Sequence, residues 1–196
     1  MDLPIYEMKL SEQGGIDAIA FVDTPAIGMK FDYFNGVNQQ FTADSEQRVV
    51  SGAAMVAGMS IYRRDETIGE YYAVFSAETI KSLVQKYFKS NKGNVVNKMH
   101  DSNQMVDGVY MFESFIIDRA RGISPPKGHE YATDGSWFVS YKIDNDDVWE
   151  NDVKTNKFKG FSIEGMFEPI HQAMGKQTTD IEGELEKIKQ LILNKK

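Results

Sequence analysis

The 196-residue sequence contains no cysteine, and this absence excludes two kinds of site. Without thiols there can be no disulfide framework, and no thiolate zinc centre or iron–sulfur cluster, which fits a protein of a reducing compartment. Histidine is scarce as well, with three scattered residues at 100, 129 and 171 and no HExxH motif. Because no ligand spacing can be recognised, we expect neither a metal nor another cofactor.

Long hydrophobic runs and basic clusters are also lacking. No apolar run approaches the roughly 20 residues of a membrane helix, and the start, MDLPIYEMKL, lacks the basic and apolar regions of a signal peptide. We therefore expect a cytosolic protein without a membrane partner. The formal net charge is −7 at pH 7, and an acidic cluster, DNDD, occupies 144–147. A phosphate backbone attracts concentrated Lys and Arg, so nucleic acid is not an expected partner.

What is present is enough apolar sequence, 41% of the residues, for one globular domain with a core. Short aromatic and β-branched runs between turn residues predict about six or seven strands. They lie at 14–28, 48–64, 70–76, 94–100, 107–118, 136–143 and 160–167. The polar, turn-rich segment 35–48 predicts a long mobile connection.

Two internal helices are predicted among these strands. In 76–90, Ser76 can cap the helix and apolar residues recur with helical spacing; 144–158 begins with good caps and predicts a shorter helix. Many strands and few helices indicate a β-rich α+β domain over 1–170, a barrel or strongly curved sheet. The remainder, 171–196, reads as a linker and an amphipathic helix, whose apolar stripe needs cover from the domain or from a second chain in a homo-oligomer.

One serine, Ser162 in FKGFSIEGMF, is a candidate nucleophile. Its surroundings read G-x-S-x-x-G, and both the G-x-S-x-G elbow and the alternating βα pattern of α/β-hydrolases are missing. A serine nucleophile needs a base, and His100, at the end of a predicted strand, is the best available one. From the residues alone two alternatives stay open, because a serine between apolar neighbours can equally be a packed strand residue and His100 a surface residue. His129 and His171 are expected to be exposed.

Several segments, in order, resemble the phage serine proteases of the XkdF type, which are relatives of the prohead proteases of tailed phages. The segments are VDTPAIG (22–28), IYRRDE (61–66), GEYYAVFSAETI (69–80), MHD (99–101), GVYMFESFIID (108–118), GSWFVSYKIDNDDVWE (135–150) and FKGFSIEGMF (158–167). The resemblance implies a closed or strongly curved β-barrel like that of herpesvirus assemblin, with flanking helices. It also implies a cofactor-independent serine endopeptidase that acts inside the procapsid, in the host cytoplasm, on phage scaffold and major capsid proteins and on itself. The alternative is a catalytically inactive assembly or scaffold-associated protein of the same fold.

The same resemblance assigns roles to two residues. His100, in MHD, matches the histidine of the NHD segment of many prohead proteases and is implied to be the general base. Ser162, in GFSI, matches their nucleophile. Glu164 departs from the pattern, since it stands where the common motif has glycine.

A third catalytic residue and the oxyanion donors are less directly indicated. IDAIAFVDTPAIG, at 16–28, resembles the strand that follows the serine in other prohead proteases, so we hypothesise that the chain is circularly permuted and that Asp17 orients His100. Arg63 and Arg64, in the YRRDE turn, are implied to stabilise the oxyanion, as arginines do in assemblins. The alternative for both arginines is a solvated hairpin with salt bridges to Asp65 and Glu66.

Overall fold

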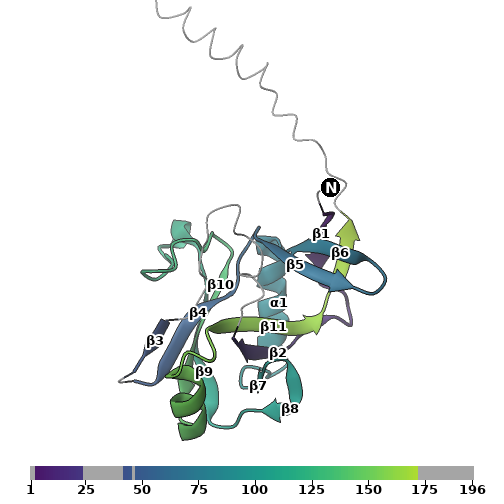
Figure 1. Cartoon of the computed structure of the whole chain (residues 1–196). Coiled ribbons are helices and arrows are strands. Elements are labelled where there is room, and N and C mark those ends of the chain that lie inside the picture. The colour runs from purple at the N-terminus through teal and green to yellow at the C-terminus, as the bar shows by residue number, and fades with distance from the viewer. Residues whose placement is uncertain (1–2, 24–41, 46, 172–196) are drawn as a thin grey trace, which may run out of the picture.

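The computed structural model describes residues 3–23, 42–45 and 47–171, and Figure 1 shows how their elements are arranged. Within these ranges twelve strands form three four-stranded sheets. In sheet A the strand order is β12 (Glu168–His171), β1 (Ile5–Lys9), β6 (Gly69–Val74) and β5 (Ser60–Asp65). In sheet B the order is β11 (Gly160–Met166), β2 (Gly15–Val22), β7 (Val96–Lys98) and β8 (Asp101–Met105). In sheet C the order is β3 (Thr42–Asp44), β4 (Val49–Met55), β10 (Trp137–Ile143) and β9 (Val109–Ile116). The predicted C-terminal helix lies outside the described residues.

The expectation of a closed or strongly curved barrel is wrong, because all three sheets are open. Closure requires one continuous ladder of hydrogen bonds with a matched tilt and stagger of all its strands. Here the ladder is divided among three sheets of four strands, and each sheet ends in two edge strands. Among the described strands β1–β6 and β2–β7 are parallel pairs, and the other pairs are antiparallel.

The first predicted helix is confirmed as α1 (Ala77–Lys89), the one α-helix among the described elements. The Ser76 side chain accepts a hydrogen bond from the Thr79 N–H and so caps it. Its apolar stripe is buried, and Tyr87 packs edge-on against Trp137 of β10 at 5.5 Å between ring centres. The helix therefore covers β2 and β10 on the core side, behind β11 in Figure 1.

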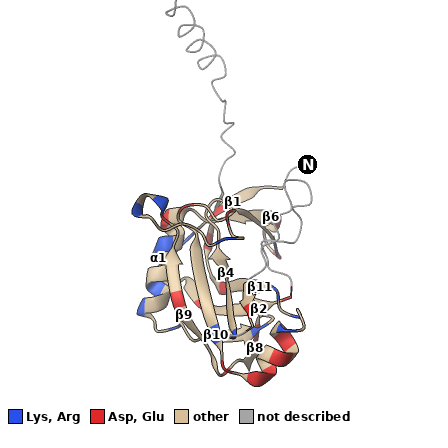
Figure 2. Cartoon of the chain, turned by 90° about the vertical axis from the view of Figure 1, so that its left-hand side faces the viewer, with Lys and Arg blue, Asp and Glu red and all other residues tan. Residues whose placement is uncertain are grey.

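The second predicted helix is present as a single wide turn, Val148–Val153. The Lys154 N–H donates to the Trp149 carbonyl five residues earlier, and the Trp149 side chain is buried. Acidic residues gather on this turn, whereas several lysines lie along α1 (Figure 2). None of the described helices is long and apolar enough to cross a membrane.

Sheets B and C meet over an aromatic core. The rings of Phe21 on β2, Tyr141 on β10 and Phe161 on β11 contact one another with centres 5.4 to 5.5 Å apart. Strand side chains alternate between the two faces of a sheet, so Phe161 and Ile163 lie on the core side. Ser162 and Glu164 consequently lie together on the other face of β11.

Gly165 explains the second glycine of the G-x-S-x-x-G segment. It follows an irregularity in the β11–β2 register, and a Cβ added there would lie 2.0 Å from the Gly15 carbonyl oxygen and 3.0 Å from the Ile16 Cα. Two paired backbones can separate only at the expense of their hydrogen bonds. The glycine is thus required by the close approach of β11 to β2 and not by a nucleophile elbow.

We expect Gly165→Ala to lower the free energy of unfolding by about 3 kcal/mol, since it overpacks a site with no room for a methyl group. Gly58→Ala is the matched control, because Gly58 has a left-handed φ of 74° but nothing within 4 Å of an added Cβ. It should cost about 1 kcal/mol, from backbone strain alone. Urea unfolding of both variants measures the difference, and equal stabilities would contradict the close approach.

Candidate active site

The serine strand β11 and the histidine turn meet on one face of sheet B. Ser162 is paired with Ala20 of β2, and Ala20 is in turn paired with Asn97 of β7; Glu164 is paired with Ala18. Neighbours in register share a face of the sheet. Both alanines are buried and short, so they leave room above β2 for longer polar side chains that reach from β11 towards β7.

A hydrogen-bonded carboxylate occupies this space. Glu164 Oε1 lies 2.9 Å from His100 Nδ1 and accepts a second hydrogen bond from Asn97 Nδ2, also at 2.9 Å. Since an ionised carboxylate can only accept, the Nδ1 of His100 carries the proton of this bond. A neutral His100 then has its Nε2 unprotonated, which is the nitrogen that a general base uses to take a proton from serine.

The turn that carries His100 is strained. Lys98 pairs with Asp101, and the two residues between them, Met99 and His100, have left-handed φ values of 56° and 61°. Such a two-residue hairpin normally contains Asn and Gly, and a left-handed residue with a side chain costs about 1–2 kcal/mol. The Met99 N–H donates to the Phe21 carbonyl at 3.0 Å, which fixes the turn to β2.

The other residue of the MHD segment, Asp101, has a structural role. Its carboxylate accepts hydrogen bonds from the Gln104 side chain at 2.8 Å and from the Asn103 N–H at 2.9 Å. Both bonds lower the pKa of Asp101, and the bond from Gln104 has the larger effect. The Asp101 carboxylate is therefore engaged in holding the start of β8. The carboxylate that contacts His100 is instead that of Glu164, 64 residues away in sequence.

Ser162 itself is 4% exposed and lines a cavity of about 30 Å³, here called the serine cavity. Its other lining residues include Arg63, Phe75 and Phe167. Among the described residues no hydrogen bond joins the Ser162 hydroxyl to the His100 ring. Ser162 and the His100–Glu164 pair therefore share a face of sheet B without a direct bond, and catalytic hydrogen bonds are often loose in the absence of substrate.

Asp17, the third residue expected from the sequence, has a different partner. Its Oδ1 accepts a hydrogen bond from Lys92 Nζ at 2.6 Å, and its side chain is 59% exposed. It is one residue from Ala18 on β2, so strand alternation directs it to the opposite face of sheet B from Glu164. The contact to His100 comes from Glu164, the residue that departs from the common motif.

The two arginines of β5 lie in different surroundings. Arg64 is exposed, whereas Arg63 is half-buried, lines the serine cavity and donates from Nη1 to the Tyr62 carbonyl at 3.2 Å. Burial lowers the pKa of Arg63. Asp65 accepts from the N–H groups of Thr67 and Ile68, and neither arginine forms an ion pair with any described residue.

The described contacts of His129 are made away from this face of sheet B. His129 is 1% exposed, contrary to the expectation from its Gly/Pro loop, and its Nδ1 lies 3.2 Å from the Tyr131 hydroxyl. Its ring packs edge-on against Phe138, and burial lowers its pKa. His171 lies in β12. The part of the chain that the structure describes holds no group of three or more His, Asp or Glu side chains suited to a metal ion.

Comparison with known proteins gives one match. The model of a family described as "Putative phage serine protease XkdF" matches residues 37–171, about two thirds of the chain. No curated protein and no solved structure matches. The matched range contains both β7–β8 with its histidine turn and β11 with its serine, whereas β1 and β2 precede it.

Proposed function

The chain belongs to the phage serine protease family XkdF, and from this premise we propose that it is the serine endopeptidase of prohead maturation. Its proposed substrates are the phage scaffold and major capsid proteins and the chain itself, cleaved inside the procapsid in the host cytoplasm. The hydrogen bond between His100 and Glu164, on the face of β11 that carries Ser162, is the observation that best supports catalysis.

In the proposed reaction Ser162 Oγ attacks the carbonyl carbon of the scissile bond, and its proton passes to His100 Nε2. Glu164 orients the ring through Nδ1 and stabilises the imidazolium. As the C–N bond breaks, His100 gives the proton to the leaving amine and an acyl-enzyme remains on Ser162. Water, deprotonated by His100, attacks the ester and restores the serine. The steps require Ser162 Oγ and His100 Nε2 to come within about 3 Å of each other.

Asn97 and Arg63 support this assignment in different ways. Asn97 is 1% exposed and donates to the same Glu164 oxygen as His100, so it fixes the carboxylate that fixes the base. Of the two arginines proposed as oxyanion donors, Arg63 lines the serine cavity and Arg64 is not among its lining residues.

One observation favours the rival function, a catalytically inactive assembly protein of the same family. Ser162 is almost fully buried, and the structure describes no hydrogen bond from its hydroxyl to His100. A nucleophile must be reached by the substrate carbonyl, whereas a packed strand serine need not be. Pairing of two chains through residues 178–196 would serve either function and remains a prediction.

Co-expression with the scaffold and major capsid proteins of the same phage separates the two functions. The wild-type chain is expected to cleave them, and Ser162→Ala to reduce the cleavage rate by about a thousandfold or more. Ser140→Ala is the matched control, since Ser140 is equally buried but bonds to Ser51 on sheet C. Fragments are quantified by mass spectrometry. If wild type and Ser162→Ala both leave every partner and themselves uncut, the protease function is excluded and the assembly function stands.

A further inference from the structure

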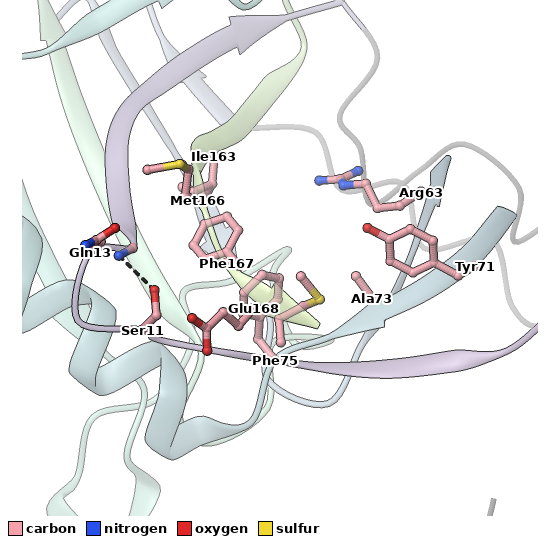
Figure 3. Close-up of a pocket in the computed structure, with 13 residues that line it drawn as sticks. Ser11, Gln13, Arg63, Tyr71, Ala73, Phe75, Ile163, Met166, Phe167 and Glu168 are labelled. Atoms are coloured by element: carbon pink, nitrogen blue, oxygen red, sulfur yellow. Dashed lines mark hydrogen bonds between the residues drawn. The ribbon is translucent and has the colours of Figure 1, made fainter. Parts of the chain in front are cut away.

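A second, larger pocket adjoins the serine cavity. This side pocket, of about 510 Å³, lies between sheet A and β11 (Figure 3). The apolar part of its wall comes from Met8, Ala73, Phe75, Ile163, Met166 and Phe167. Pockets of 300–1,000 Å³ are the usual size for small ligands, so this one accommodates a peptide side chain together with part of its backbone.

The side pocket and the serine cavity share part of their walls. Both are lined by Arg63, Phe75, Ile163 and Phe167. The residue Ser162 lines the serine cavity and Arg63 lines both cavities, so the side pocket adjoins the segment of β11 that carries the proposed nucleophile. The side pocket is therefore placed to receive a substrate residue close to the scissile bond.

One side of the side pocket carries a cation that has no ion-pair partner among the described residues. The one hydrogen bond described for the Arg63 side chain uses a single N–H of the five on its guanidinium. Its cross-strand neighbour Tyr71 is 8% exposed, and its hydroxyl faces the guanidinium in Figure 3. A half-buried guanidinium among apolar walls is stabilised most by a carboxylate that it can hold with two hydrogen bonds.

The acidic residue of the side pocket does not supply that carboxylate. Glu168 lies on the other side of the pocket in Figure 3, near Ser11 and Gln13, and forms no ion pair with Arg63. The pocket is thus positive towards the serine cavity and negative away from it. An acidic side chain is favoured at the Arg63 end and a basic one is not.

We infer that the side pocket is a specificity pocket, in which Arg63 binds the carboxylate of an aspartate or glutamate flanking the scissile bond of the substrate. This inference rests on the proposed protease function. It makes Arg63 a substrate-binding residue and distinguishes it from a general oxyanion donor, which would act on every peptide alike.

Cleavage of a randomised peptide library by the full chain tests the inference, with cut sites read by mass spectrometry. For wild type we expect Asp and Glu to be enriched at one position beside the cut, and kcat/KM for a Glu peptide to exceed that for its Gln analogue about ten- to hundredfold. Arg63→Met should bring this ratio close to one, Arg63→Lys should keep only part of it because an ammonium cannot form the two parallel bonds, and Arg63→Glu should favour Lys or Arg. Arg64→Met is the matched control and should leave the ratio unchanged. Thermal melts confirm that each variant folds.

The other outcomes separate the inference from the proposed function. If Arg63→Met slows Glu and Gln peptides equally, Arg63 acts on the oxyanion and the inference is overturned. If wild type cuts no peptide, the protease function fails on its own, and binding to the Ser162→Ala protein then decides the inference. Fluorescent peptides ending in Glu should bind about tenfold more tightly than those ending in Gln, and equal affinities would refute an acid-binding pocket.

Discussion

Glu164→Gln is expected to lower kcat/KM for the proteolysis of scaffold protein by about 10³- to 10⁴-fold without unfolding the protein. The glutamine can still accept hydrogen bonds from Asn97 and His100, but it has no charge to stabilise the imidazolium that forms when His100 takes the serine proton. Steady-state cleavage of a scaffold-derived peptide measures the loss. Glu150→Gln, an exposed carboxylate that bonds to Lys154 and lines neither cavity, is the control and should change the rate far less.

Non-additivity distinguishes a catalytic from a structural role for Glu164. Residues that act as a unit lose their separate effects once one of them is gone. The double variant Ser162→Ala/Glu164→Gln should therefore be no slower than Ser162→Ala alone, and the rate at which a fluorophosphonate labels Ser162 should fall in the Glu164→Gln single variant. Normal labelling and normal proteolysis by Glu164→Gln would disprove the proposed triad.

The second large expected effect is a loss of folding stability when the ion pair between the Val148–Val153 turn and Lys98, next to the histidine hairpin, is removed. Asp152 is 2% exposed, and its two oxygens bind Lys98 Nζ at 2.5 Å and Lys157 Nζ at 2.6 Å. Removal of one partner from a buried ion pair typically costs about 3–5 kcal/mol, so Asp152→Asn should lower the free energy of unfolding by about 3 kcal/mol. Asp147→Asn is the matched control, because Asp147 is 71% exposed and lies 3.7 Å from the same lysine. It should cost less than about 1 kcal/mol in urea unfolding.

The same carboxylate makes stability depend on pH in a defined direction. Burial alone raises the pKa of Asp152, but the hydrogen bonds and charges of Lys157 and Lys98 outweigh it and hold the pKa below its ordinary value. The folded state therefore binds fewer protons than the unfolded state. The contribution of the Asp152 carboxylate to stability is complete above its pKa in the unfolded chain, about 4, and is lost as the pH falls through its lower pKa in the folded protein. Between pH 7 and pH 3 wild type should lose more stability than Asp152→Asn, and parallel losses would contradict the shift.

Local pattern predicted the elements better than their arrangement. The spacing around Ile80, Leu83 and Tyr87 predicted α1, and short aromatic runs between turn residues predicted β10 and β11. Strands β8 (DSNQM) and β12 (EPIH) lack such a pattern. They are strands because they pair with β7 and β1. Open sheets instead of a barrel also follow from long-range pairing, which no short segment of sequence encodes.

In the candidate site too, local pattern was informative and long-range arrangement was not predicted. The period-two alternation of any strand places Glu164 on the same face as Ser162, but nothing local indicates that β7 lies two strands away from β11. Ala18 and Ala20 were the available signal, because short side chains on a central strand leave space for polar groups above it. Asp17 is one residue from that face, and a shift of one residue along a strand exchanges the two faces of a sheet.

The pairing of β11 with β2, and of β12 with β1, also determines when the site can form during synthesis. β1 and β2 are made early and these two partners late, so β2 has no serine-bearing neighbour until nearly the whole domain has been translated. Contacts between such distant segments form late in folding. Prematurely terminated or nascent chains would therefore contain the histidine turn without its carboxylate, and only polypeptides synthesised past β11 could acquire proteolytic activity.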